Sequence, residues 1–438
     1  MSKQPLAPPS GSRDFLPREA LFRDGVLSRV KAAFALHGFS PIDTPAFERI
    51  ETLSGKYGEE GEKLIFKILK RGDKAASGEA DLALRYDLTV PTMRMYAHRR
   101  GDLPRIVKRY QIGPVWRADR PGRGRFREFY QCDVDIIGSA SRLADIEILL
   151  ALSAALRALD LTGFTIRLNS RHVIGGMLDG YGVPPEKARA VTVALDKFDK
   201  IGADGVAAEL TAGGLPAAIV QPLAKDIADP AFDEIVRERL KDSEAGQAGL
   251  AEVDEILARA RPLLDGAQIR FDPILARGLD YYTGPIFEFF AEGGAGSIAG
   301  GGRYDDLAGM FLKDSVPVCG GSLGIERIMM LLSESDIGEE PAATVYVTVW
   351  DADAAPDALR MATALRGAGV SVDLDLEGGR IGKQMKAADA RGCRFALIQG
   401  PDEKQSGAVV IKEMASGAQH TVPEAEAAAT VARLMESD

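Results

Sequence analysis

Apolar and polar positions along the chain repeat with two different periods, which divide the N-terminal half into helices and strands. Residues 18–36 carry apolar side chains at helical spacing and are followed by Gly38, which predicts a helix that stops there. The next run, "FSPIDTPAFE", predicts a short strand interrupted by its two prolines. Residues 83–88 are strand-like and should become helical around Pro91, because proline is favoured in the first turn of a helix. A further helix is predicted at 145–159, followed by a strand at "TIRLNS".

Two runs rich in β-branched and aromatic residues, "RIVKRYQIGPVWRAD" and "REFYQCDVDIIG", predict the strands of a β-hairpin with the basic tip "RPGRGRF". On the second strand, residues separated by even numbers share one face, and these are Phe129, Gln131, Asp133 and Asp135. Carboxylate and amide groups on one sheet face suit a cationic, hydrogen-bonding ligand. Arg117, late in the first strand, suits a phosphate.

The sequence pattern changes twice in the second half of the chain. Residues 184–264 are alanine-rich and amphipathic, which predicts a helical insertion. A strand-like run follows, "IRFDPILARGLDYYTGPIFEFFA". If Tyr281 and Tyr282 lie on a strand, their side chains should face opposite sides of it. The run "PVCGGSLGIERIMMLL" predicts a strand, then glycines, then a helix with Arg327 in its first turn.

The C-terminal part alternates strand-like and helical segments after an acidic stretch. Residues 333–343 contain acids, glycine and proline and are typical of a linker. Beyond them, "TVYVTVW", "VSVDLDL" and "RFALIQG" alternate with helical patterns at 355–367 and 383–391. This pattern predicts a small α/β domain over 344–438 with a mostly parallel sheet.

The charge of the chain is unevenly distributed. The formal net charge is −10, yet residues 94–127 hold eleven Lys and Arg against two acids, interleaved with aromatic residues. A local basic strip on an acidic protein favours a defined polyanionic ligand over non-specific attraction.

Composition excludes several other classes of protein. No apolar run approaches the roughly 18–20 residues that span a bilayer, and the N-terminus has no apolar signal-peptide core, so we expect a cytoplasmic protein with no membrane partner. The three cysteines are far apart and the four histidines do not cluster, so we expect no structural metal bound by the protein.

Together these motifs resemble a known family. Their order, a proline-interrupted strand, an arginine hairpin and a glycine-rich strand–helix with arginine, resembles the three motifs of class II aminoacyl-tRNA synthetases. The runs "LRYDLTVP", "GRFREFYQCDVDI", "ARGLDYYTG" and "GGGRYDDL" are similar to signatures of the histidyl-tRNA synthetase family. The resemblance extends from about Gly11 through the C-terminal domain and weakens only in the helical insertion. Bacterial members more often carry Glu where this chain has Asp87.

The resemblance implies a fold and an activity. The fold is α/β: a class II antiparallel sheet flanked by helices in residues 1–332, with the helical insertion, and an anticodon-binding α/β domain at 344–438. The activity is ATP-dependent conversion of L-histidine to histidyl-adenylate and transfer of the histidyl group to the 3′ end of tRNA(His). The resemblance also implies a homodimer, and Mg²⁺ that arrives bound to ATP.

The resemblance also assigns residues to roles. The catalytic candidates are Arg277, which would reach the ATP α-phosphate and the substrate carboxylate, and Arg117 and Arg327, which would grip the phosphates. Further ATP-binding candidates are Arg125 and Phe129, whose ring would stack on adenine. The histidine pocket is expected to comprise Asp87, Leu88, Thr89, Arg117, Gln131, Asp135, Arg277, Tyr281, Tyr282 and Tyr304. The basic residues of 380–394 are candidates for contacts with the anticodon.

Two other interpretations compete with this one. A non-catalytic synthetase paralogue that regulates ATP phosphoribosyltransferase usually lacks both the "RGLDYY" run and the C-terminal domain, and this chain has both. A nucleotide-dependent RNA-binding protein would have no use for a complete amino-acid pocket. The synthetase interpretation also explains why no general base is visible, because the substrate carboxylate is itself the nucleophile.

Overall fold

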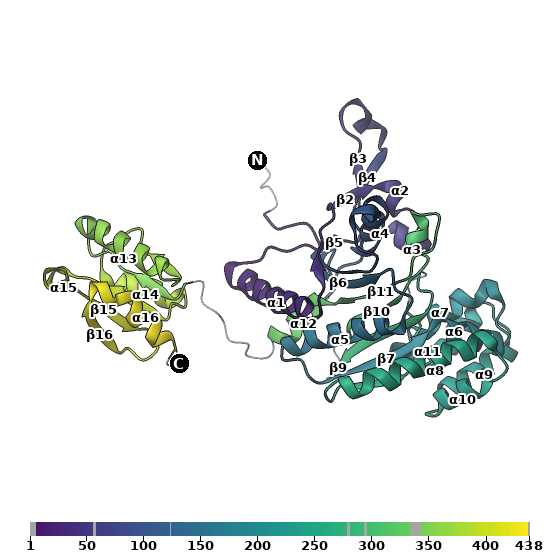
Figure 1. The fold of residues 1–438 in the computed structure, drawn as a ribbon. Helices are drawn as coiled ribbons and strands as arrows, with labels where there is room; N and C mark the ends of the chain where they lie inside the picture. The colour runs from purple at the N-terminus through teal and green to yellow at the C-terminus, as the bar shows by residue number, and fades with distance from the viewer. Residues whose placement is uncertain are drawn as a thin grey trace. The chain divides into compact units, whose positions relative to one another are not determined.

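The computed structural model describes residues 6–55, 58–122, 124–277, 281–292, 296–333 and 343–436. The chain divides into two compact units, one of Met1–Asp14 with Val26–Asp336 and one of Phe15–Gly25 with Ile337–Asp438 (Figure 1). Each unit has a sheet of its own. No helix among the described residues is long and apolar enough to cross a membrane.

The larger unit is built on an eight-stranded sheet. Its strands, in spatial order, are β1 (Ser40–Pro41), β5 (Val107–Trp116), β6 (Glu128–Ile137), β11 (Val318–Leu323), β10 (Ser297–Arg303), β9 (Pro285–Ala291), β7 (Phe164–Ser170) and β8 (Gln268–Phe271). The outermost pairs, β1 with β5 and β7 with β8, are parallel, and every pair between them is antiparallel. This confirms the expected antiparallel sheet, with the predicted hairpin as β5 and β6.

Helix α5 (Arg142–Ala158) covers one face of this sheet, where it contacts β6, β10 and β11 (Figure 1). Ser141 caps its N-terminus by accepting a hydrogen bond from Leu143 N. The buried side chain of Leu152 lies over Gly321 of β11. Helix α12 (Ile325–Ser333) contacts β6 and β10, and α4 (Thr89–Arg99) follows β4 and has Pro91 in its first turn, as the sequence indicated.

The remaining elements of the larger unit lie at the two ends of the sheet. Helices α6 to α11 lie at the β7 end of the sheet (Figure 1), and α7 to α11 fall within residues 184–264, where the sequence predicted a helical insertion. The second half of α1 (Pro17–Leu36) brings Phe34 against Tyr110 of β5, with ring centroids 5.8 Å apart. A small sheet has the order β2-β4-β3. The bounds are β2 (Phe47–Arg49), α2 (Ile50–Leu53), α3 (Gly58–Lys63), β3 (Lys67–Leu69), β4 (Ala80–Leu84), α6 (Arg171–Gly180), α7 (Ala188–Leu195), α8 (Phe198–Ala212), α9 (Ala217–Ile227), α10 (Phe232–Arg239) and α11 (Glu244–Ala260).

The smaller unit has a five-stranded sheet in the order β13-β12-β14-β15-β16. The pairs among β13, β12 and β14 are parallel, whereas β14, β15 and β16 pair antiparallel. The prediction of a mostly parallel sheet is therefore wrong for its C-terminal half, where a turn with Gly417 at φ +75° closes a hairpin. The bounds are β12 (Val345–Val347), α13 (Ala355–Gly367), β13 (Val372–Leu374), α14 (Ile381–Ala390), β14 (Phe395–Ile398), α15 (Pro401–Ser406), β15 (Ala408–Glu413), β16 (Gln419–Pro423) and α16 (Ala427–Glu436).

The larger unit contains one strand that was not predicted, and one expectation does not apply to it. The unpredicted strand is β10, a glycine-rich run near residue 300 that lies near the middle of the sheet between β11 and β9. Tyr281 and Tyr282 lie in the connection before β9 and not on a strand, so the alternation expected for them does not apply. The expected linker at 333–343 falls almost entirely outside the described residues.

Candidate active site

A cavity of about 160 Å³ opens where β6, β10 and β11 meet the segment before α4 and the segment before β9. This volume is below the ~300–1,000 Å³ of pockets for drug-sized ligands, so the cavity suits a small molecule. Its lining is polar and aromatic and consists of Asp87, Thr89, Arg117, Gln131, Asp133, Asp135, Arg277, Tyr281, Tyr282, Gly300, Tyr304, Gly320, Gly321 and Ser322.

The cavity brings together every residue that was expected in the histidine pocket except one. Leu88 is buried at the start of α4, where its carbonyl oxygen accepts a hydrogen bond from Thr92 Oγ1 at 2.7 Å. Asp87, next to it, accepts a hydrogen bond from Val90 N at 3.0 Å, which orients its carboxylate at the N-terminus of α4. The segment before α4 therefore contributes Asp87 and Thr89 to the cavity.

Two buried carboxylates on β6 form the acidic floor of the cavity. Asp133 and Asp135 are only 2% and 1% exposed. Burial raises the pKa of Asp133 to about 6 and that of Asp135 to about 7, although Arg109 lowers both. Arg109 lies opposite Asp135 in the β5–β6 register and forms a buried ion pair with it. The hydroxyl of Tyr304 donates a hydrogen bond to the same carboxylate.

Some polar atoms around the cavity lack partners. Among the described residues, the buried atoms Gln131 Oε1, Asp133 Oδ1 and Arg277 Nε have no hydrogen-bond partner. Buried polar atoms in folded proteins are nearly always paired with protein or with water, so these atoms are available to a polar ligand. A molecule that satisfies them must donate hydrogen bonds to the floor and accept one from Arg277.

Arg277 lies over the β10 side of the cavity in an unusual backbone conformation, with φ +41°. Its Nη1 donates to Glu288 Oε1 at 2.8 Å and to Phe287 O at 3.3 Å. The guanidinium occupies the space where a Cβ on Gly300 would stand. Burial alone would lower the pKa of Arg277, but Tyr282 and Glu288 raise it above its ordinary value, so the side chain remains charged.

Three tyrosine rings close the side of the cavity next to Arg277. The ring centroids of Tyr281 and Tyr282 are 4.9 Å apart, and those of Tyr281 and Tyr304 are 5.5 Å apart. Tyr281 and Tyr282 both line the cavity, so the alternation expected for a strand does not apply to them. The cause is the irregular connection in which they lie.

The candidates for ATP binding lie outside the cavity lining, apart from Arg117. The Arg117 guanidinium stacks over the rings of Tyr86 and Phe129, at 4.3 and 5.2 Å from their centroids. Phe129 shares the β6 face with Gln131, so Arg117 and Phe129 extend the site toward the hairpin tip. Arg125 is 65% exposed and pairs with Asp119 at 2.8 Å, and Arg327 Nη1 donates to Ser297 O at 2.6 Å.

Several lining residues were not predicted. Asp133 shares a strand face with Gln131 and Asp135, a signal that the alternation already contained. Ser322 lies opposite Asp133 in the β6–β11 register, and nothing local in the sequence indicates that pairing. No group of His, Cys, Asp or Glu within the described ranges has the arrangement of a metal site.

The known proteins that are similar to this chain include histidine–tRNA ligases. A family model described as histidyl-tRNA synthetase matches residues 11–328, and one described as an anticodon binding domain matches residues 344–434. A histidine–tRNA ligase of Gloeobacter violaceus is 38% identical, with 98% of each chain covered, and one of Aeropyrum pernix is 40% identical with the same coverage.

Solved structures agree with these relatives. The crystal structure of histidyl-tRNA synthetase from Nostoc sp. PCC 7120 matches with a TM-score of 0.83 and 30% identity, covering 99% of this chain and 100% of that one. A structure from Bacillus halodurans C, described as an ATP phosphoribosyltransferase regulatory subunit/histidyl-tRNA synthetase, has a TM-score of 0.71 but only 23% identity, over 87% of this chain and 96% of that one, and shows a common fold.

The raised pKa of Asp133 leads to a prediction about stability. An aspartate whose pKa rises from about 4 in the unfolded chain to about 6 on folding stabilises the protein below about pH 4, and this contribution is lost as the pH rises through about 6. Asp133→Asn buries no charge. The difference between its thermal unfolding midpoint and that of the parent should therefore shift in favour of the variant as the pH rises from 5 to 7.5. Asp24→Asn, at an exposed position, is the control and should follow the parent at both pH values. If the midpoints of Asp133→Asn and the parent change with pH in parallel, ionisation of Asp133 does not destabilise the folded protein.

Proposed function

The chain belongs to the histidyl-tRNA synthetase family, and from this premise we propose how its residues divide the work of the reaction. The protein is an aminoacyl-tRNA synthetase that activates histidine with ATP and transfers it to tRNA(His). The observation that carries the division of roles is the set of unpartnered polar atoms in the cavity, Gln131 Oε1, Asp133 Oδ1 and Arg277 Nε.

In this proposal, L-histidine fills the cavity with its hydrogen-bond donors toward the acidic floor. Gln131 and Asp135 accept hydrogen bonds from the substrate, and Tyr304 lies near its imidazole. Asp87 and Thr89, at the start of α4, hold the α-ammonium group. The substrate carboxylate then faces Arg277, the donor on the opposite side of the floor.

ATP lies beyond the amino acid, toward the hairpin tip. The adenine stacks on Phe129 after Arg117 moves from that ring to the α-phosphate, while Arg327 and Arg125 bind the outer phosphates. Mg²⁺ enters as part of the ATP substrate and neutralises charge on the phosphates. A histidine carboxylate oxygen attacks the α-phosphorus, the bond from that phosphorus to the bridging oxygen breaks, and pyrophosphate leaves. The chain supplies positioning and positive charge for this step and needs no base.

The tRNA substrate would engage both units. The match of residues 344–434 to an anticodon-binding model supports contacts with the anticodon, and α14 carries part of the basic run 380–394. Lys383 and Arg391 are more than half exposed, although they pair with Glu377 and Asp373. Tight phosphate binding there would require exchanging those ion pairs for contacts with tRNA.

The regulatory paralogue is the less favoured alternative. Its support is the likeness to the Bacillus halodurans structure, which at 23% identity extends to the fold alone. A regulatory protein would have no reason to keep unpartnered acceptors and an arginine in one cavity of amino-acid size. Pyrophosphate exchange separates the two functions.

The purified protein should catalyse exchange of labelled pyrophosphate into ATP with histidine and with none of the other nineteen standard amino acids. The reason is the donor–acceptor pattern of the cavity, which requires a side chain that donates hydrogen bonds to buried carboxylates. Exchange with a different amino acid would overturn the pocket assignment. No exchange with any amino acid would favour the regulatory role.

Arg277→Lys should reduce the rate of adenylate formation by about 10²–10³, or roughly 3–4 kcal/mol, because lysine keeps the charge but lacks the planar fork. The loss should appear in turnover and not in substrate affinity. Glu288→Gln is the matched control, because it removes the ion pair at 2.8 Å and leaves the guanidinium in place. If Arg277 only braces the fold through Glu288, the glutamine variant should be impaired as much as the lysine variant. Pre-steady-state adenylate formation measures both.

We further propose a homodimer. The segment of α1 and "FSPIDTPAFE" resembles the dimerisation motif of class II synthetases, which pairs two subunits about a two-fold axis. Light scattering at micromolar concentration should give twice the 46.9 kDa chain mass. A mass of one chain would contradict the dimer.

A further inference from the structure

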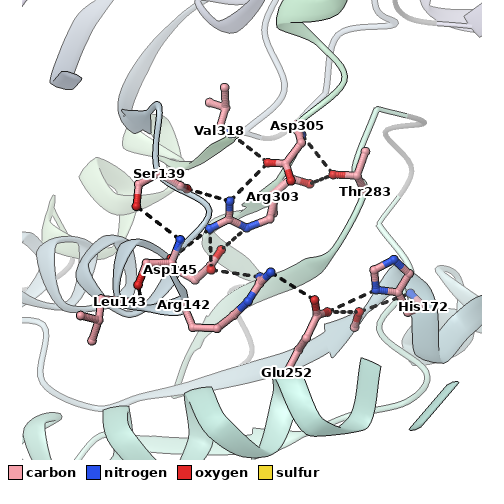
Figure 2. A network of polar contacts seen from close by, with 12 residues as sticks. Ser139, Arg142, Leu143, Asp145, His172, Glu252, Thr283, Arg303, Asp305 and Val318 are labelled. Carbon is pink, nitrogen blue, oxygen red and sulfur yellow. Dashed lines mark hydrogen bonds and ion pairs between the residues drawn. The ribbon is translucent and has the colours of Figure 1, made fainter. Parts of the chain in front are cut away.

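A buried arginine stands behind the cavity, on the helix-covered face of the sheet (Figure 2). Arg303 is the last residue of β10, and its side chain is 2% exposed. The Arg303 side chain reaches Asp145 of α5, whereas Tyr304, directly after the strand, lines the cavity. The guanidinium forms a two-pronged ion pair with Asp145 of α5, with Nε 3.1 Å from Oδ1 and Nη2 2.7 Å from Oδ2.

Arg303 uses all five of its N–H donors. Besides the two that reach Asp145, Nη1 donates to Ser139 O at 3.0 Å and to Asp305 Oδ1 at 3.3 Å, and Nη2 donates to Ser141 O at 3.3 Å. These acceptors come from the segment that leads into α5 and from the segment just after β10. Because the guanidinium is planar and all its donors are engaged, it fixes the position of the end of β10 relative to α5.

The backbone around Arg303 carries the aromatic wall of the cavity. Its carbonyl oxygen accepts a hydrogen bond from Thr283 N at 2.8 Å, and Asp305 N donates to Thr283 Oγ1 at 3.1 Å. Thr283 directly follows Tyr281 and Tyr282. Asp305 also accepts a hydrogen bond from Val318 N of β11 at 2.9 Å. The rings of Tyr281, Tyr282 and Tyr304 are thus attached to the residues that Arg303 holds in place.

We propose that Arg303 is a positioning residue for the amino-acid pocket, which acts by fixing the end of β10 against α5 through Asp145. The inference rests on the proposed role of the cavity in histidine binding. A buried ion pair is often no more stabilising than well-packed apolar side chains of similar volume, so stability alone does not account for this one. Its directional contacts instead set where the three tyrosine rings stand.

The same network offers an internal control. Arg142, 21% exposed, bridges Asp145 at 3.2 Å and Glu252 of α11 at 3.2 Å, and Glu252 accepts a hydrogen bond from Ser170 Oγ at 3.1 Å (Figure 2). Arg142 shares Asp145 with Arg303, but none of its ion pairs reaches β10. Replacing Arg142 should therefore perturb the network and leave the tyrosine wall in place.

The test compares Arg303→Lys, the double variant Arg303→Met with Asp145→Leu, and Arg142→Met in the full-length protein. Histidine-dependent and ATP-dependent pyrophosphate exchange give the KM for each substrate, and thermal unfolding gives stability. Arg303→Lys should raise the KM for histidine at least about tenfold, the equivalent of one or two weakened hydrogen bonds, and change the KM for ATP far less. The double variant removes both charges together, so it should unfold near the parent midpoint and still show the raised KM for histidine. Arg142→Met should keep the parent KM.

Two outcomes would overturn the proposal. One is a lowered unfolding midpoint in Arg303→Lys with an unchanged KM for histidine, which would make the ion pair a support of the fold alone. The other is a normal KM for histidine in the folded double variant. A parent protein that shows no histidine-dependent exchange would instead contradict the pocket assignment itself, and with it the basis of this inference. If Arg303→Lys does not fold, the double variant still decides the question.

Discussion

The cost of burying two carboxylates on one strand governs the architecture of the site. Asp133 and Asp135 are 2% and 1% exposed, so water solvates their charge poorly. Arg109 on the adjacent strand and the Tyr304 hydroxyl compensate Asp135, but Asp133 retains an unpartnered oxygen. The ligand-free pocket is therefore incomplete in electrostatic terms. A cationic molecule that binds there offsets the desolvation of the carboxylates, so binding is selective for charge as well as shape.

Only part of the positive charge of the basic run at 94–127 is open to a polyanionic ligand. Its side chains are engaged largely by neighbours in the same unit, as in the pairs Arg109 with Asp135, Lys108 with Glu147, Arg94 with Glu48 and Arg125 with Asp119. Arg117 is stacked between Tyr86 and Phe129. Part of the positive charge is thus already paired within the unit. A charge count along the sequence cannot separate such scaffold from an open surface, because the separation depends on which acids the fold brings alongside.

The hairpin was predictable because its signals are local: β-branched runs, a glycine-rich tip and alternation that places Gln131, Asp133 and Asp135 on one face. The assembly of Asp87, Arg277 and Tyr304 around that face was not local information, and it came from the family resemblance. What the sequence could not supply depends on register and close packing. The pairing of Arg109 with Asp135 follows from the alignment of two strands. Strand β10 was overlooked because glycine weakens a strand on average, and its glycines are explained by what lies against them.

Those glycines limit how the pocket can be altered. Gly300 lies against the Arg277 guanidinium, and Gly320 lies against the Asp135 carboxylate and the Tyr304 hydroxyl, so neither position has room for even a methyl group. Because glycine has no side chain to shorten, no substitution at these two positions can enlarge the cavity. A variant that accepts a bulkier amino acid must find its space at the tyrosine wall. That wall is hydrogen-bonded through Thr283 to the end of β10 and the residues after it. A redesign for a larger substrate would therefore also have to preserve those hydrogen bonds.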